Sequence, residues 1–177
     1  MNTLTSTTQM NITQTIAVPR LGHVHLRVAD LDRAVRFYCD LLGFHVTAYG
    51  PDFGLPAAFL ALDDYHHHLG LNTFQSLNGT PPPEGHTGLY HVALLYPSQA
   101  ALADAVRRVA EQDWPIDSAE DHGATLSVYL RDPDGNGLEL YYDLPQVQWI
   151  DENGRPVLKA EPFDWRTLLA ETTTTVE

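Results

Sequence analysis

The sequence has little cysteine, little positive charge and no long hydrophobic run. Cys39 is the single cysteine among 177 residues, which excludes an intrachain disulfide and a cysteine-rich metal site. Ten Lys and Arg residues stand against 23 Asp and Glu residues, and the resulting formal charge of -13 disfavours nucleic acid and anionic membranes as partners. No apolar stretch approaches the length of a membrane span, and no signal peptide pattern opens the chain. These absences predict a soluble cytoplasmic protein.

Histidine, in contrast, is abundant, and two of its nine copies lie in a repeated pattern. The pattern Leu–x–His–Val–x–Leu begins at Leu21 (LGHVHLRV) and again at Leu89 (LYHVALLY). After each copy the sequence predicts a helix and three further strands, which include His66–Phe74 in the first unit and Trp114–Ser118 and Thr125–Arg131 in the second. The chain therefore divides into two βαβββ units. Asp30 and Ser98 are the expected helix N-caps, and Gly43 is the expected end of the first helix.

These signals divide the chain into five expected segments. Residues 1–16 are a polar tail without periodicity, which is typical of disorder. Residues 17–76 form the first module, 77–87 a Pro- and Gly-containing linker, and 88–145 the second module. Residues 146–177 are apolar enough to predict a C-terminal tail that packs on the body. The length suits two small modules that share a core, and two tandem βαβββ modules predict an α+β fold.

The clearest local signal is the β-hairpin YLRDPDGNGLELY, which ends at Tyr141. Pro133 and Gly135 suit a tight turn, and Asp132 can accept hydrogen bonds from nearby backbone N–H groups. Glu139 follows the turn between two leucines of the strand. Since strand side chains alternate, its carboxylate points away from both leucines. For one Glu, a solvated strand face is the default interpretation.

The repeat gives that carboxylate three candidate partners. His23 and His91 occupy the same place in the two units, and a correction for the longer second unit places His67 at the position equivalent to Glu139. A lone histidine is more often a packed core residue than a ligand, but the joint pattern favours a metal site. Two histidines and one carboxylate on one face are the ligand set of many non-heme iron(II) enzymes.

These motifs resemble the vicinal oxygen chelate superfamily, which contains glyoxalases, bleomycin resistance proteins and extradiol dioxygenases. HVHLRVADLDRAVRFY and YLRDPDGNGLELY carry the general resemblance, whereas HHHLGLNTF followed by GLYHVALLYP is similar to small type I catechol 2,3-dioxygenases. The resemblance covers residues 21–142. It implies an eight-stranded cup built from both modules, with helices outside and a metal inside. It also implies a homo-oligomer.

The resemblance further implies an Fe(II)-dependent, ring-cleaving extradiol dioxygenase that inserts both atoms of O2 into a catechol, with Mn(II) as the alternative metal. His23, His91 and Glu139 match the metal ligands, and His67 matches the general acid–base histidine. Tyr129, ten residues before Glu139, and His122 match residues that contact substrate oxygens; His122 lies about two residues nearer to Tyr129 than in some larger members.

Two alternatives use the same fold for other functions. One is another metalloenzyme, such as a glyoxalase I-like isomerase or a thiol transferase. The isomerase needs a second carboxylate at the position where the comparison of the two units places His67. The other is a metal-free small-molecule binding protein, which would not need His23, His91 and Glu139 together.

Overall fold

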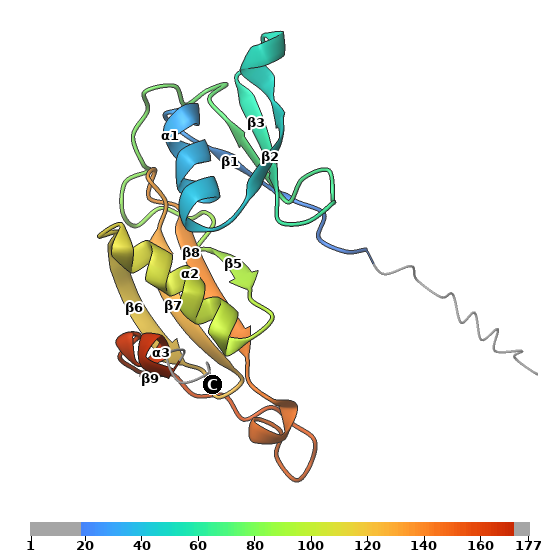
Figure 1. Cartoon of the computed structure of the whole chain (residues 1–177), viewed down its shortest axis with the longest axis vertical. Helices are drawn as coiled ribbons and strands as arrows, with labels where there is room; N and C mark the ends of the chain where they lie inside the picture. The colour runs from blue at the N-terminus through green and yellow to red at the C-terminus, as the bar shows by residue number, and fades with distance from the viewer. Residues whose placement is uncertain (1–18, 172–177) are drawn as a thin grey trace, which may run out of the picture.

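The computed structural model describes residues 19–171, and the expected tail 1–16 lies outside that range. The first module contains four strands and one helix (Figure 1). In chain order these are β1 (Val24–Arg27), α1 (Leu31–Arg36), the π-helical turn η1 (Phe37–Leu41), β2 (His45–Tyr49), the 3-10 turn η2 (Gly50–Phe53), β3 (Ala57–Ala61) and β4 (Leu69–Asn72).

The second module repeats this order and is followed by a C-terminal extension. It contains β5 (Val92–Leu95), α2 (Gln99–Glu111), β6 (Ile116–Asp121), β7 (Thr125–Arg131) and β8 (Gly137–Asp143). The extension contains η3 (Gln146–Gln148), β9 (Glu161–Pro162) and α3 (Arg166–Glu171). β9 adds to the edge of β6, and Leu168 of α3 is buried. Among the described residues, no helix has the length and apolar character needed to span a membrane.

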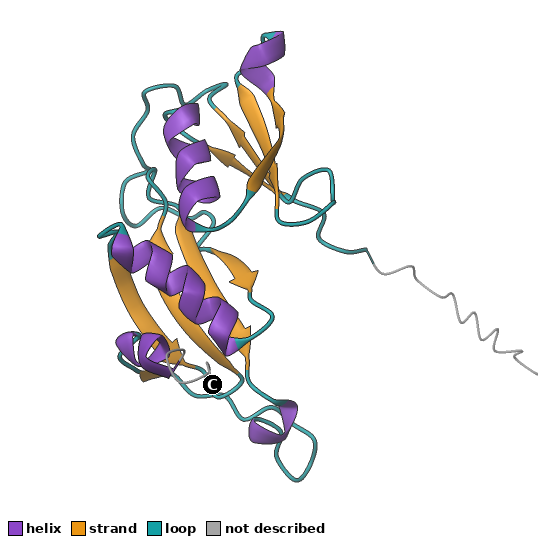
Figure 2. Ribbon diagram, viewed as in Figure 1, coloured by secondary structure: helices purple, strands orange, loops and turns teal. Residues whose placement is uncertain are grey.

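The strands form two sheets with the same internal order. The four-stranded sheet runs β1-β4-β3-β2, and the five-stranded sheet runs β5-β8-β7-β6-β9. In each module the first strand pairs in parallel with the last, and the remaining pairs within the module are antiparallel. Figure 2 shows the sheets following one another along the molecule's long axis, with α2 across one face of the five-stranded sheet. The predicted α+β class with two βαβββ units is confirmed.

Helix ends in both modules follow the sequence signals. The side chain of Asp30 accepts a hydrogen bond from the N–H of Arg33, and that of Ser98 accepts one from Ala101, so both predicted N-caps are confirmed. Gly43 has a φ of 80°, the left-handed conformation in which a helix commonly ends. The buried faces of the helices pack on the sheets in a core that includes both modules.

A buried polar contact joins the two modules. The hydroxyl of Tyr38 donates to Oδ2 of Asp132 over 2.9 Å, and burial, followed by that carboxylate, raises the pKa of the phenol well above its usual value. Asp134 accepts from the N–H of Ala29 and from the guanidinium of Arg33. Nε of Arg108 on α2 donates to the carbonyl oxygen of Leu41. The DPDG turn of the second module therefore holds the first module in place.

Two strands are shorter than the sequence predicts. The expected strand from His66 to Phe74 is reduced to β4, and residues 62–66 and 68 form bends that precede it. The N–H of Tyr65 donates to the carboxylate of Asp63, a local turn that competes with strand pairing. His67 therefore lies before β4 and not within it. His91 likewise lies one residue before β5.

Candidate active site

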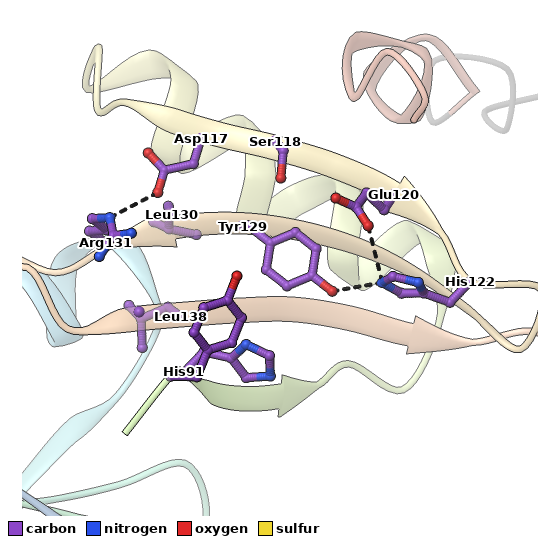
Figure 3. A pocket seen from close by; sticks show the side chains of 11 residues that line it. His91, Asp117, Ser118, Glu120, His122, Tyr129, Leu130, Arg131 and Leu138 are labelled. Atoms are coloured by element: carbon purple, nitrogen blue, oxygen red, sulfur yellow. Dashed lines mark hydrogen bonds and ion pairs between the residues drawn. The ribbon is translucent and has the colours of Figure 1, made fainter. Parts of the chain in front are cut away.

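A pocket with several polar lining residues lies on the face of the five-stranded sheet. It has a volume of about 350 Å³, within the range of small-molecule sites. Figure 3 shows side chains from β6 and β7 around it, together with His91 and His122. Its polar lining comprises Tyr90, His91, Asp117, Ser118, Glu120, His122, Tyr129 and Arg131.

His91, which lines the pocket, contacts Glu139. Leu138 and Leu140 are buried in the core, so strand alternation directs Glu139 to the opposite face, where its side chain is 13% exposed. Nε2 of His91 lies 3.0 Å from Oε2 of Glu139. A Cβ atom at Gly137 would stand 2.1 Å from the carbonyl oxygen of Tyr90, so only glycine permits this close approach of β8 to the segment that carries His91.

Tyr129 and His122 extend the pair into a hydrogen-bonded chain. The hydroxyl of Tyr129 donates to Oε1 of Glu139 over 2.9 Å, and Nε2 of His122 lies 2.7 Å from the same hydroxyl. Burial, followed by the hydrogen bond to Glu139, raises the pKa of Tyr129 to about 12. The phenol is therefore a neutral donor near pH 7. Nδ1 of His122 lies 3.3 Å from the carbonyl oxygen of Lys159, so the C-terminal extension orients this ring.

The other two predicted site histidines, His23 and His67, lie together beside the four-stranded sheet, just before β1 and β4. The ring centroids of His23 and His67 are 4.5 Å apart, and Phe59 packs 5.0 Å from His67. His66 contacts His67 through their Nδ1 atoms at 2.7 Å. Burial, followed by the charge of His23, lowers the pKa of His67. A neutral imidazole, able to accept a proton near pH 7, is therefore favoured at His67.

Strand register corrects the predicted equivalence of His67 and Glu139. Ala93 pairs with Glu139 in the second module, and His25, its repeat counterpart, pairs with Gly70 in the first. Tyr129 and Phe59 occupy corresponding places on the neighbouring strands. The counterpart of Glu139 is thus Gly70. A Cβ at Gly70 would lie 2.8 Å from Nδ1 of His25, so the imidazole of His25 fills the space that a longer side chain would need.

The predicted metal ligands are divided between the two sheets. Nε2 of His91 and Oε2 of Glu139 are as close as neighbouring ligands of one ion, since two ligands about 2.1 Å from a metal and at right angles to it lie roughly 3.0 Å apart. Nδ1 of His91 is buried without a partner. Within residues 19–171, however, no three His, Cys, Asp or Glu side chains gather as a metal site requires. One chain therefore offers two of the three donors, and the triad that includes His23 remains a prediction.

Three charged residues of the pocket were not predicted. Asp117 and Glu120 lie on β6, a strand that the sequence predicted to end at Ser118. The third residue, Arg131, forms an ion pair with Asp117 over 3.1 Å. The segment IDSAED lacks the apolar alternation of a typical strand, so its exposed face gave no signal. The pairing of β6 with β7 places these side chains beside Tyr129.

Two stacked βαβββ modules with a His–Glu pair on the second sheet define the class of protein. Residues 20–140 match the model of the Glyoxalase/Bleomycin resistance protein/Dioxygenase superfamily, and the chain belongs to this superfamily. Over 157 residues it is 35% identical to a catechol-2,3-dioxygenase from Bacillus subtilis (strain 168), covering 85% of this chain and 51% of that protein. The chain thus spans about half the length of this relative.

Other relatives carry a different activity. A lactoylglutathione lyase from Haemophilus influenzae is 30% identical over 123 residues, which cover 66% of this chain and 87% of the lyase. Among solved structures, a glyoxalase/dioxygenase from Nostoc punctiforme superposes with a TM-score of 0.60 at 22% identity, covering 82% of this chain and 99% of that one. The similarity to the Nostoc punctiforme structure shows that the two chains share a fold. The relatives thus include both dioxygenases and lyases.

Proposed function

We propose that this protein is an Fe(II)-dependent extradiol dioxygenase that cleaves the ring of a catechol. The observation that carries the proposal is the presence of glycine, not a carboxylate, at the position equivalent to Glu139. With His23, His91 and Glu139 as ligands, Gly70 leaves a set of two histidines and one carboxylate. Such a set leaves metal positions open for a diol and O2, as in two-His-one-carboxylate enzymes. The similarity to a catechol-2,3-dioxygenase supports the same assignment.

The remaining site residues suit the handling of a diol. Tyr129 is a neutral phenol that donates its one hydroxyl hydrogen to Glu139, and with Glu139 bound to a metal it could donate that hydrogen to a substrate oxygen instead. His122, held by the carbonyl oxygen of Lys159, presents Nε2 on the same side. His67 has a lowered pKa and can accept a proton from a catechol hydroxyl and later return it. The bound metal would supply the site at which the diol and O2 meet.

The alternative is a glyoxalase I-like isomerase, and the similarity to a lactoylglutathione lyase favours it. That activity needs a second carboxylate in the first module. The structure has Gly70 at the equivalent position, and the imidazole of His25 occupies the space beside it. A metal-free binding protein is the third candidate, and it would leave the His91–Glu139 pair without a chemical role.

The test is anaerobic loading of the full chain with Fe(II), followed by air and catechol. We expect a yellow ring-opened product, and no isomerase activity with a hemithioacetal. Glu139→Ala should lose both the bound iron and the product, whereas the matched control Glu84→Ala, in the exposed linker, should keep both. Full iron occupancy in Glu139→Ala would refute the ligand assignment. Iron binding without ring opening would refute the dioxygenase.

A further inference from the structure

One carboxylate of the pocket has no part in the chemistry proposed above. Glu120 lines the pocket but matches neither a metal ligand nor the acid–base histidine. We propose that Glu120 determines substrate specificity: it selects a catechol whose ring carries a short, positively charged alkylammonium substituent. The proposal rests on the proposed function and names the class of catechol that the dioxygenase would cleave.

Strand geometry directs Glu120 toward the pocket. Its neighbour on β6, Ala119, is buried in the core, so the side chains before and after Ala119 point to the opposite face of the sheet. Those two residues are Ser118 and Glu120, and both line the pocket. The side chain of Glu120 is 36% exposed, so its carboxylate is accessible to a ligand in the pocket.

Three acidic residues lie on β6, and Glu120 is the one without a Lys or Arg partner in the part of the chain that the structure describes. Asp117 is paired with a guanidinium over 3.1 Å, and Asp121 is paired with the ammonium group of Lys159 over 2.8 Å. The ion-pair neighbour of Glu120 is Nε2 of His122, at 3.9 Å (Figure 3). That distance exceeds a hydrogen bond, and the imidazole balances the charge only when it is protonated. The Glu120 carboxylate is therefore available to a cation that enters the pocket.

An anionic substituent, in contrast, finds no free Lys or Arg among the described residues that line the pocket. Arg131 is the one such residue in the lining, and its Nε pairs with Asp117. Its Nη1 donates to the carbonyl oxygen of Gly135 over 3.1 Å. A carboxylate on the ring would also come close to Glu120, and like charges repel. The pocket thus offers a free negative charge, which favours a cationic substituent over an anionic one.

Glu120 lies within reach of a ring that binds next to Glu139. Oε1 of Glu139 is 2.9 Å from the hydroxyl of Tyr129, which is 2.7 Å from Nε2 of His122. That nitrogen is 3.9 Å from Oε2 of Glu120. Three short contacts therefore connect the two carboxylates, and one aromatic ring with a two-carbon chain is long enough to bridge them. The pocket volume of about 350 Å³ is at the lower end for small-molecule sites, so it suits a single ring better than two linked rings.

Binding of an amine in the absence of iron tests the role of Glu120 by itself. The probe is 2-phenylethylamine, which carries the ring and the ammonium group but no diol, and its anionic counterpart is phenylacetate. Both are titrated into the full chain without metal, and binding is followed by chemical shifts in NMR spectra. We expect the amine to bind more tightly than phenylacetate. Glu120→Gln should weaken amine binding roughly two- to fivefold, the scale of a partly exposed ion pair.

Two further variants separate the charge of Glu120 from any effect on the fold. Glu152→Gln removes an equal charge at an exposed position of the C-terminal extension, so it should leave both affinities unchanged. Glu120→Lys should reverse the order of the two affinities, because its ammonium group attracts phenylacetate and repels the amine. An amine that binds no more tightly than phenylacetate, or that binds Glu120→Gln as well as the wild type, would overturn the proposal.

Ring cleavage by the iron-loaded chain tests the same selection in turnover and separates it from the proposed function. The substrates are 4-(2-aminoethyl)catechol, the neutral 4-ethylcatechol and the anionic 3,4-dihydroxyphenylacetate. We expect the highest kcat/KM for the amine, and its ratio to that of 4-ethylcatechol should fall roughly two- to fivefold in Glu120→Gln. Cleavage of all three with equal kcat/KM would support the dioxygenase and overturn selection by Glu120. Amine binding that depends on Glu120, without cleavage of any catechol, would support the cation site and refute the dioxygenase.

Discussion

Tyr38→Phe tests the interface that fixes the two modules relative to one another. The change removes only the hydroxyl that donates to Asp132, and Tyr38 is 1% exposed, so water cannot replace it. Asp132 keeps three donors: the N–H groups of Asp134 and Asn136 and the side-chain amide of Asn136. Loss of one bond to a charged acceptor should therefore cost about 1.5–2 kcal/mol, near the lower end for such bonds. For a chain of this size the melting temperature should fall by roughly 3–8 °C.

Urea unfolding of the wild type and the variant, followed by circular dichroism, measures this difference. Tyr49→Phe is the matched control, because Tyr49 also donates to a carboxylate, that of Asp32, but in a solvent-exposed place. That variant should change the free energy of unfolding by less than about 0.5 kcal/mol. Equal effects of the two substitutions would refute the argument that the Tyr38–Asp132 contact holds the modules together. A smaller slope of the free energy of unfolding against urea concentration in Tyr38→Phe would indicate that the modules unfold separately.

Two further predictions concern the site. His67→Phe should keep iron and catechol binding but slow turnover by about 10²–10⁴-fold, the usual contribution of general acid–base catalysis. The control His45→Phe, on exposed β2, should not slow turnover. Loss of iron in His67→Phe would instead make His67 a metal ligand. Chelation should abolish activity while the circular dichroism spectrum stays native, because the apolar core of both modules forms without a metal; a collapsed spectrum would contradict this.

Local chemistry made much of the fold predictable from the sequence. The hairpin strand from Thr125 to Arg131 has the predicted bounds, and Asp132 accepts the backbone N–H groups that its turn position suggests. Caps at Asp30 and Ser98 were predictable because each depends on a side chain and the N–H three residues later. These features are decided within a few residues, and long-range packing does not compete with them.

Features decided by long-range pairing were predicted less well. His67 was aligned with Glu139 by counting residues, but the bends between Leu62 and His68 shift the register so that Gly70 takes that place. The π-helical turn after α1 and the pairing of β9 with β6 also lack a local signal.

The corrected register also explains how two copies of one module acquired different chemistry. In the first module, His25 on the first strand pairs with Gly70 on the last strand. At the equivalent positions of the second module, Ala93 on the first strand pairs with Glu139 on the last. Each sheet has room for one long side chain there, because the paired residues face the same side. A carboxylate at position 70 would require His25 to leave its place over the glycine. The exchange of a small and a large residue between neighbouring strands thus leaves a single carboxylate in the predicted ligand set.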